Sequence, residues 1–207
     1  MKLKQSEKSG FTRERILKAA EAEFAEKGFY GARVDAIAEA SGVNKRMIYA
    51  HFESKEKLYT KALLIMYERL AECEREFIVD NLDPMEAISG VIHVSFKYLL
   101  ENPSMIRMLM WENLNRGKSV PEEDIINLKA PSFDYIKRQL RRGIDMGIFR
   151  NDIDEHHMVL SLMNFCFSYF SNIYTMSVLL GRDMANESEV LGRADFITDM
   201  IFKYLSA

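Results

Sequence analysis

The segment NKRMIYAHF, which begins at Asn44, combines apolar and hydrogen-bonding side chains at helical spacing. Ile48 and Phe52 stand about one helical turn apart and define the buried side of a short helix. Lys45 and Arg46 project away from that side, and their long side chains can donate to the phosphates and base edges of a DNA major groove. The alternative is an ordinary solvated helix face.

The residues before this segment predict a second short helix and a tight turn. Val34, Ile37 and Ala38 recur at helical spacing. Gly42 can adopt the positive φ that a short turn between two helices requires, and Asn44 is a suitable N-cap for the helix that follows. A small residue at Ala38, a glycine turn at Gly42 and a buried apolar residue at Ile48 predict a helix-turn-helix. This motif places its second helix in a DNA groove.

We find no catalytic or metal-binding pattern elsewhere in the sequence. It lacks a nucleophile elbow, an HExxH zinc motif, a phosphate loop and a dinucleotide fingerprint. His156 and His157 are adjacent, so on a helix their side chains diverge by about 100° and do not bind one ion as an i, i+4 pair does. Cys73 and Cys166 belong to no CxxC pair, so buried thiols are expected. We therefore expect no enzyme activity, no metal and no cofactor.

The charge of the chain is unevenly distributed. The 207 residues carry a net charge of −3, but residues 1–60 are net +3 and residues 61–207 are net −6. A positive N-terminal part suits contact with phosphates, whereas the acidic remainder would be repelled by DNA. The first ten residues are polar and lack an apolar core, so no signal peptide is expected. We expect the protein to work in a reducing cytoplasm.

Several segments in the first third of the chain together resemble the DNA-binding domain of the tetracycline-repressor-like (TetR) family. They are AEAEFAEKGFYG, the turn IAEASGV, the helix ending IYAHF and the helix start SKEKL, all within residues 12 to about 63. The resemblance implies a DNA-binding domain followed by a helical domain that binds a small effector and pairs with a second subunit. It also implies that Lys55 contacts phosphate. Arg33 departs from the pattern, because the family usually has Ser or Thr there to cap the second helix.

Candidate DNA contacts lie at the starts of the first and second helices, on the recognition helix from Lys45 to His51, and just after it. Residues 1–10 are expected to form a flexible basic arm, whose lysines are a further candidate for phosphate or minor-groove contact. The set of candidate DNA-binding residues is Thr12, Arg33, Asn44, Lys45, Arg46, Met47, Tyr49, His51 and Lys55.

The rest of the chain predicts helices only. Apolar residues from Leu58 to Phe77 recur at steps of three and four, which predicts one long helix over residues 55–79 that links the two domains. Asp83-Pro84 and Asn102-Pro103 are helix starts, whereas Pro131 is expected to break a helix.

The stretch from Met158 to Leu180 contains no charged residue and is long enough to cross a bilayer. Seven of its residues are Ser, Thr or Asn, which argues against insertion into a membrane. A helix that is apolar nearly all round is better explained as buried on two sides. The resemblance implies that one side faces the effector and the other a second subunit. The last helix is expected to start at Asn186, with Glu189 in capping-box register, and to pair with the same helices of a second subunit.

The predicted fold class is all-α, with an arm over residues 1–10, a three-helix helix-turn-helix domain over 11–54 and a larger ligand-binding and dimerisation domain over 55–207. A cluster of Met and aromatic residues predicts an adaptable apolar cavity, although the same residues would also form an ordinary core. Candidate pocket residues are His93, Met105, Met108, Trp111, Asn113, Phe133, Met163, Asn164, Phe167 and Tyr169. Candidate residues of a dimer interface are Phe170, Tyr174, Ile197 and Ile201.

The predicted function is a ligand-responsive transcriptional regulator. It would be a homodimeric repressor that binds a near-palindromic double-stranded operator and is released by a small, largely apolar effector. The alternatives are a helical module that uses the same motif to bind a protein, and an enzyme on this scaffold. Steep salt dependence of DNA binding separates the regulator from the interaction module, because phosphate contacts release counterions.

Overall fold

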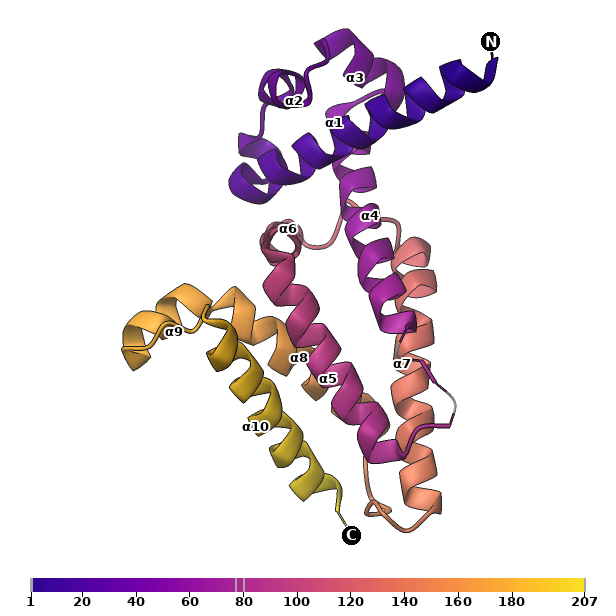
Figure 1. The fold of residues 1–207 in the computed structure, drawn as a ribbon, viewed down its shortest axis with the longest axis vertical. Coiled ribbons are helices and arrows are strands. Elements are labelled where there is room, and N and C mark those ends of the chain that lie inside the picture. The colour runs from indigo at the N-terminus through magenta and orange to yellow at the C-terminus, as the bar shows by residue number, and fades with distance from the viewer. Residues whose placement is uncertain (1, 77, 80, 207) are drawn as a thin grey trace. The chain divides into compact units, whose positions relative to one another are not determined.

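The structure, a computed structural model, describes residues 2–76, 78–79 and 81–206, and it describes side chains from residue 10 onward. These residues form ten α-helices and no strand, which confirms the all-α class (Figure 1). The helices are α1 (Lys2–Gly31), α2 (Val34–Ser41), α3 (Lys45–Phe52), α4 (Lys55–Arg75), α5 (Pro84–Glu101), α6 (Pro103–Leu114), α7 (Glu122–Asp145), α8 (Glu155–Ser171), α9 (Ile173–Leu180) and α10 (Glu187–Leu205).

The helices divide into two compact units. The first unit consists of Met1–Tyr67 and Arg107–Ile125, and the second consists of Glu68–Ile106 and Ile126–Ala207. The first unit therefore contains α1 to α3, the helices of the helix-turn-helix motif. It also contains the first part of α4, the helix that the sequence analysis expects to link the two domains, and much of α6, which the sequence analysis placed in the larger domain.

The first unit is built around one apolar side of α1. Ile16 and Phe24 are fully buried on that side, and the Phe24 ring makes an edge contact with Tyr59 of α4 at a centroid distance of 4.9 Å. α2 packs against α1, and α3 packs against α2, with Ile37 and Ile48 buried between them. The three helices thus share one small core.

α1 begins earlier than the sequence predicts. Thr12 was expected to cap it and residues 1–10 to form a flexible arm, but the helix starts at Lys2 and Thr12 lies inside it. No proline stands between Lys2 and Thr12, so the helix can continue backward at a small cost in propensity. Gly28 interrupts the other end of α1 with φ 66° and ψ 178°, a conformation that is essentially restricted to glycine.

The turn between α2 and α3 has a backbone conformation that glycine adopts most easily. Gly42 is left-handed, with φ 64° and ψ 32°, and the Asn44 side chain accepts a 2.9 Å hydrogen bond from the Met47 N–H. The Arg15 guanidinium of α1 donates to the Ser41 carbonyl at the end of α2. The same guanidinium would lie 2.6 Å from a Cβ on Gly42. The predicted glycine turn and N-cap are both confirmed.

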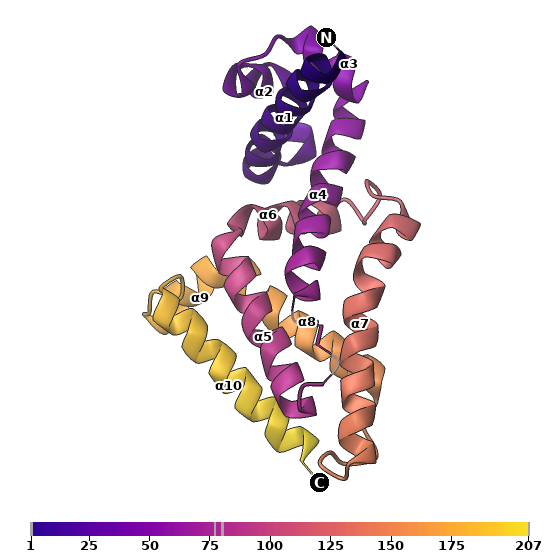
Figure 2. The ribbon, with the colours of Figure 1, turned by 45° about the vertical axis from the view of Figure 1, so that its right-hand side comes forward.

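In the second unit, α5 runs beside α10, as Figures 1 and 2 both show, and α8 also packs on α5. Phe96 of α5 is fully buried and its ring contacts Tyr169 and Phe170 of α8, at centroid distances of 5.5 and 5.6 Å. Ile92 of α5 and Ile197 of α10 are also buried. The core of this unit is therefore apolar and aromatic where α5, α8 and α10 meet.

Three helix boundaries in the second half of the chain differ from the prediction. Pro131 lies inside α7, because the buried residues on both sides of it hold the helix together across the one missing N–H. Asn172 divides the predicted helix from Met158 to Leu180, since its side chain donates to the Ser168 carbonyl and competes with the helical ladder. α4 ends at Arg75, whose side chain donates to the Ala71 carbonyl in the last turn.

Gly42→Ala should lower the free energy of unfolding by about 1–3 kcal/mol, because it strains a left-handed residue and displaces Arg15 from Ser41. Gly117→Ala is the matched control, since Gly117 has φ 65° in the same unit and no atom within 4 Å of the Cβ position. We expect the control to lose only the backbone part, about 1 kcal/mol. Urea denaturation followed by circular dichroism measures both, and equal losses would show that the Arg15 contact adds nothing.

Candidate DNA-binding interface and effector unit

One face of α3 is fixed to the first unit and the other is free to contact a ligand. Ile48 and Phe52 are buried, whereas Arg46 is exposed and Met47 and Tyr49 are each 39% exposed. The Asn44 cap satisfies an N–H in the first turn, so the start of α3 is well ordered. α3 thus presents side chains of the types that contact base edges and phosphates.

Two of the predicted lysine contacts are held in place by neighbours. The Lys45 ammonium forms an ion pair with Asp35 of α2 at 3.0 Å, and both side chains remain about half exposed. The ammonium of Lys55, at the start of α4, lies 4.9 Å from the centroid of the Phe29 ring of α1. His51 is half-buried against Phe52. Each of the two ammonium groups therefore lies beside a neighbour within the first unit.

The start of α2 has an unusual cap. Arg33 occupies the N-cap position and makes no side-chain cap of its own. Instead, its backbone N–H donates to the Glu23 carboxylate of α1 at 3.0 Å. Lys27 pairs with the same carboxylate at 3.0 Å, so the Arg33 side chain is left exposed. Glu23 is a structural residue that the sequence did not identify, because it lies ten residues before its partner.

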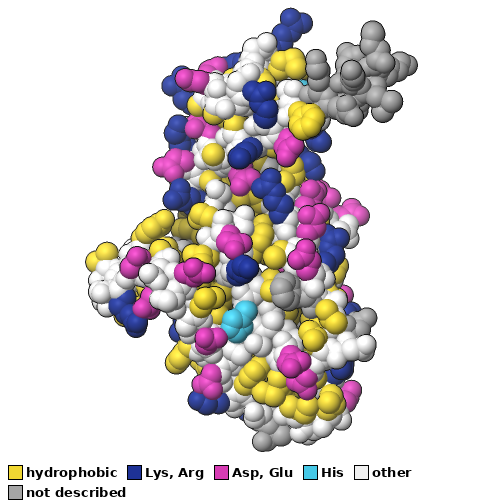
Figure 3. Space-filling model, viewed as in Figure 1, with side chains coloured by type: hydrophobic (Ala, Val, Ile, Leu, Met, Phe, Trp, Pro, Cys, Tyr) yellow, Lys and Arg dark blue, Asp and Glu magenta, His cyan; other side chains and the backbone are white. Residues whose placement is uncertain are grey.

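The visible face of the first unit carries Lys and Arg side chains interspersed with Asp and Glu (Figure 3). On this face the positive side chains are therefore mixed with negative ones. Thr12 lies half-buried within α1, and Arg33 lies at the start of α2. A modest net positive charge favours a binder whose specificity comes from α3 rather than from bulk charge.

The predicted pocket residues are divided between the two units. Met108, Trp111 and Asn113 belong to the first unit, where Trp111 packs so closely on Gly28 that a Cβ there would lie 2.6 Å from its ring. His93 is partly exposed on α5, and its Nε2 lies 2.8 Å from the Asp195 carboxylate of α10, within hydrogen-bond distance. The others lie in the second unit: Met105 and Tyr169 are buried, Phe133, Met163 and Phe167 are half-buried, and Asn164 is exposed.

The core of the second unit contains a buried ion pair that the sequence analysis missed. Glu74 of α4 and Lys129 of α7 are in contact, with Nζ 2.5 and 2.6 Å from the two carboxylate oxygens. The Ser132 hydroxyl donates to the same carboxylate at 2.5 Å. The pairing joins residues 55 positions apart, so only a break in the apolar pattern of each helix could have indicated it.

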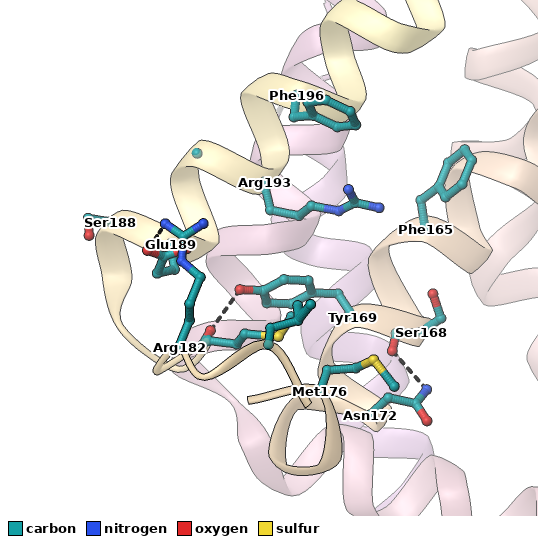
Figure 4. Close-up of a pocket in the computed structure, with 13 residues that line it drawn as sticks. Phe165, Ser168, Tyr169, Asn172, Met176, Arg182, Ser188, Glu189, Arg193 and Phe196 are labelled. Atoms are coloured by element: carbon teal, nitrogen blue, oxygen red, sulfur yellow. Dashed lines mark hydrogen bonds and ion pairs between the residues drawn. The ribbon is translucent and has the colours of Figure 1, made fainter. Parts of the chain in front are cut away.

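A groove in the second unit lies between α8, α9 and α10 and has a volume of about 690 Å³ (Figure 4). Phe165 of α8 and Arg193 and Phe196 of α10 point into it, and Tyr169 closes one end by donating to the Met184 carbonyl at 2.7 Å. Large apolar side chains are exposed on the same three helices: Leu160, Tyr174, Val178, Leu179, Leu180, Leu191 and Phe196.

Of the four residues predicted for a dimer interface, only Tyr174 is exposed. Phe170, Ile197 and Ile201 are buried within the chain itself, so they stabilise the second unit and do not form its surface. Their helical faces were assigned by apolar periodicity, which marks burial but cannot separate a core from an interface.

The remaining candidate sites have structural explanations. Cys73 and Cys166 are free thiols, and burial raises the pKa of Cys166 to about 12. His156 and His157 are both exposed in the first turn of α8, whose N-cap is Asp154. Among the described residues, no group of three or more His, Cys, Asp and Glu side chains is placed to hold a metal ion. Within the same residues, no helix is both long enough and apolar enough to cross a membrane.

The fold and the interface together define a helix-turn-helix DNA-binding protein with a second helical unit. Comparison with known proteins agrees. Residues 16–62 match the family "Bacterial regulatory proteins, tetR family", and residues 84–201 match "Tetracyclin repressor-like, C-terminal domain".

Individual relatives extend the match over nearly the whole chain. The HTH-type transcriptional repressor NicS of Pseudomonas putida is 31% identical over 195 residues, which cover 94% of this chain and 92% of that protein. SCO4942 of Streptomyces coelicolor superposes with a TM-score of 0.70 at 24% identity, covering 94% and 98%. FadR of Bacillus subtilis, in complex with stearoyl-CoA, gives a TM-score of 0.70 at 18% identity, covering 92% and 98%.

The chain belongs to the TetR family of bacterial regulatory proteins. It is a DNA-binding transcriptional repressor, as predicted, and the family is one of regulators rather than enzymes.

Glu23 should make the stability of the protein depend on acid pH. Burial alone would raise its pKa, but the hydrogen bond from the Arg33 N–H and the Lys27 contact outweigh burial and hold the pKa below its ordinary value of 4.5. A carboxyl whose pKa is lower in the folded state adds stability that is full above about pH 4.5 and is lost as the pH falls through the folded-state value.

Glu23→Gln should therefore lower the free energy of unfolding by about 1 kcal/mol at neutral pH and by progressively less below pH 4.5. Denaturant titrations across this range measure the difference. Glu14→Gln, at an exposed position on the same helix, is the control and should follow the wild type. A deficit for Glu23→Gln that does not change with pH would contradict the proposed cap.

Proposed function

We propose that the protein represses transcription as a homodimer that binds a near-palindromic operator and is released by a small, largely apolar effector. The observation that carries the DNA-binding part is the exposed donor face of α3, held by the Gly42 turn, the Asn44 cap and the buried Ile48. A homodimer would place two such helices in successive major grooves, about one DNA turn apart.

Arg46 and Lys45 are the proposed contacts to bases or phosphates, and Tyr49, His51 and Lys55 the proposed contacts to phosphates. Arg46 is exposed, and an arginine can donate two parallel hydrogen bonds to a guanine edge. Lys45 would exchange part of its contact with Asp35 for a phosphate. The Lys55 ammonium lies at the N-terminal end of α4, where an anion is favoured.

A second copy of the chain is the proposed occupant of the groove between α8, α9 and α10. A two-fold interface brings a patch against its own copy, so it must carry both signs of charge or neither. Arg182 and Glu189 form an ion pair beside the groove, and Arg193 covers the Phe196 ring at 5.3 Å. A mixed-charge rim around exposed apolar side chains supports self-association rather than binding of a strongly charged partner.

The effector would act by changing the population of DNA-competent dimers. To do so it must bind the incompetent state more tightly, because equal affinity for both states shifts nothing. α4 supplies residues to both units, so it is the proposed connection between effector and DNA-binding helices. The FadR structure with stearoyl-CoA supports an apolar effector, since it shows that this fold can hold a long acyl chain.

Selection of random genomic fragments from the source organism on the purified protein, sequenced after elution at moderate salt, tests this function. We expect enrichment of one near-palindrome, and a binding constant that falls steeply with salt. A well-folded dimer that enriches no sequence would favour the protein-interaction alternative.

Arg46→Ala should weaken specific operator binding by about 1–3 kcal/mol and leave the oligomeric state unchanged. Fluorescence anisotropy with the selected operator measures the loss. Arg138→Ala is the control, because Arg138 is an exposed arginine on α7 of the second unit. Equal operator affinity of Arg46→Ala and wild type would remove Arg46 from the interface.

Phe196→Asp should convert the dimer to a monomer, because two-fold symmetry would place two added charges in one apolar interface. Phe196 is 57% exposed, so the isolated chain should keep its stability. Sedimentation velocity measures the mass. Leu114→Asp, at a leucine that is 73% exposed in the first unit, is the matched control and should remain dimeric. A dimeric Phe196→Asp would place the interface elsewhere.

A further inference from the structure

Two donors on one side of α7 form a complete receptor for a carboxylate in the core of the second unit. Lys129 and Ser132 are three residues apart, so their side chains project from the same helical face. The ammonium contacts both oxygens of Glu74, and the hydroxyl donates to one of them. All three residues are at most 9% exposed. The group that Lys129 and Ser132 bind within the chain is thus a carboxylate, that of Glu74.

Stability alone does not account for a buried ion pair. Removing two charges from water costs several kcal/mol, and well-packed apolar residues of the same volume often stabilise a core as well or better. Glu74 is also poorly placed on its own helix, because α4 ends one residue later and the negative end of a helix disfavours an anion. The two α7 donors hold this carboxylate against that effect.

A small void adjoins the pair. It is lined by Ile78, Val91, Val94 and Tyr135 together with Glu74 and Ser132, so its wall is mostly apolar. Its volume of about 10 Å³ is too small for any effector and corresponds at most to one water molecule. A ligand could enter only if the Glu74 side chain moved out of the core. The space that this side chain occupies would then be added to the void.

We infer that Lys129 and Ser132 bind the carboxylate of an amphipathic effector, which displaces Glu74 and extends its apolar part along Ile78, Val91 and Val94. This inference rests on the proposed function, because it gives the effector of that repressor a chemical class. An effector with an amine would instead use Glu74. The geometry favours the carboxylate, since α7 offers two donors from a continuous helix, whereas Glu74 offers one acceptor group from a helix end.

Displacement of Glu74 also has a defined mechanical consequence. Glu74 is the point at which the last turn of α4 is tied to α7 by hydrogen bonds from Lys129 and Ser132. A free carboxylate on these donors would release that turn. The effector and the α4 end would therefore compete for one site, which gives the effector the differential affinity for two states that release of an operator requires.

The first test replaces the internal carboxylate by a free one. Glu74→Ala leaves a cavity beside Lys129, so sodium acetate should raise its Tm relative to sodium chloride at equal ionic strength, by an amount that grows with the logarithm of the acetate concentration above the Kd. Glu74→Ala/Lys129→Met should not respond, and neither should Glu74→Gln, in which a neutral side chain still fills the site. If Glu74→Ala folds poorly, its refolding yield in acetate against chloride gives the same comparison. Equal responses of the single and double variants would overturn the inference.

The second test uses wild-type protein and four eight-carbon probes: octanoate, octanamide, octylamine and octanoyl-CoA. Octanoate should raise the Tm and release the operator selected above, and Lys129→Met should weaken octanoate binding about 10- to 100-fold. Octanamide and octylamine should do neither. Stronger binding of the amine, binding only of the thioester, or an unchanged octanoate affinity in Lys129→Met would each overturn the carboxylate site.

The two tests separate this inference from the function on which it rests. If the unliganded wild type binds no operator, the proposed function fails, while acetate rescue and octanoate binding can still succeed. If the operator is bound and is released only by uncharged compounds, the proposed function stands and the carboxylate site is wrong.

Discussion

The orientation of the DNA-binding helix depends on the left-handed backbone at Gly42. That conformation turns the chain within three residues, and it leaves α3 attached to the core through only a few side chains, of which Ile48 and Phe52 are the buried ones. Because the attachment is on one side, the other side can carry any donors without a cost in packing. Function and stability are therefore separated on α3, and its exposed residues can be selected for DNA alone.

α1 holds both ends of α2 through polar contacts. Glu23 accepts the Arg33 N–H where α2 begins, and Arg15 donates to the Ser41 carbonyl where it ends. Backbone groups at helix ends otherwise lack partners, so the two contacts together fix the position of α2 along α1. This arrangement explains how an arginine can stand where the family usually has a capping Ser or Thr. The cap has moved to another helix, and the Arg33 side chain has been released to the surface.

The sequence could predict the features of this fold that depend on contacts between residues close together in the chain. Asn44, Asp83 and Asn186 cap helices through hydrogen bonds two or three residues long, and all three were identified from the sequence. The pairs that were missed join distant positions, as Glu74 and Lys129 do across 55 residues. The predicted interface residues Ile197 and Ile201 failed for a different reason, since an apolar stripe does not say which partner covers it.

An apolar cluster in the sequence need not be an apolar pocket. Met105 of the second unit and Met108 of the first are buried, and Trp111 packs on Gly28 within the first unit, so these side chains already have partners within the chain. Space for a ligand must then come from a contact that can be given up. Apolar packing is lost in small parts as the side chains move apart. In an ion pair, by contrast, one charged group can be exchanged for another ion of the same charge. A domain that must be stable without its effector and yet able to admit one is better served by the second kind of contact, and in this core that contact is the one between Glu74 and Lys129.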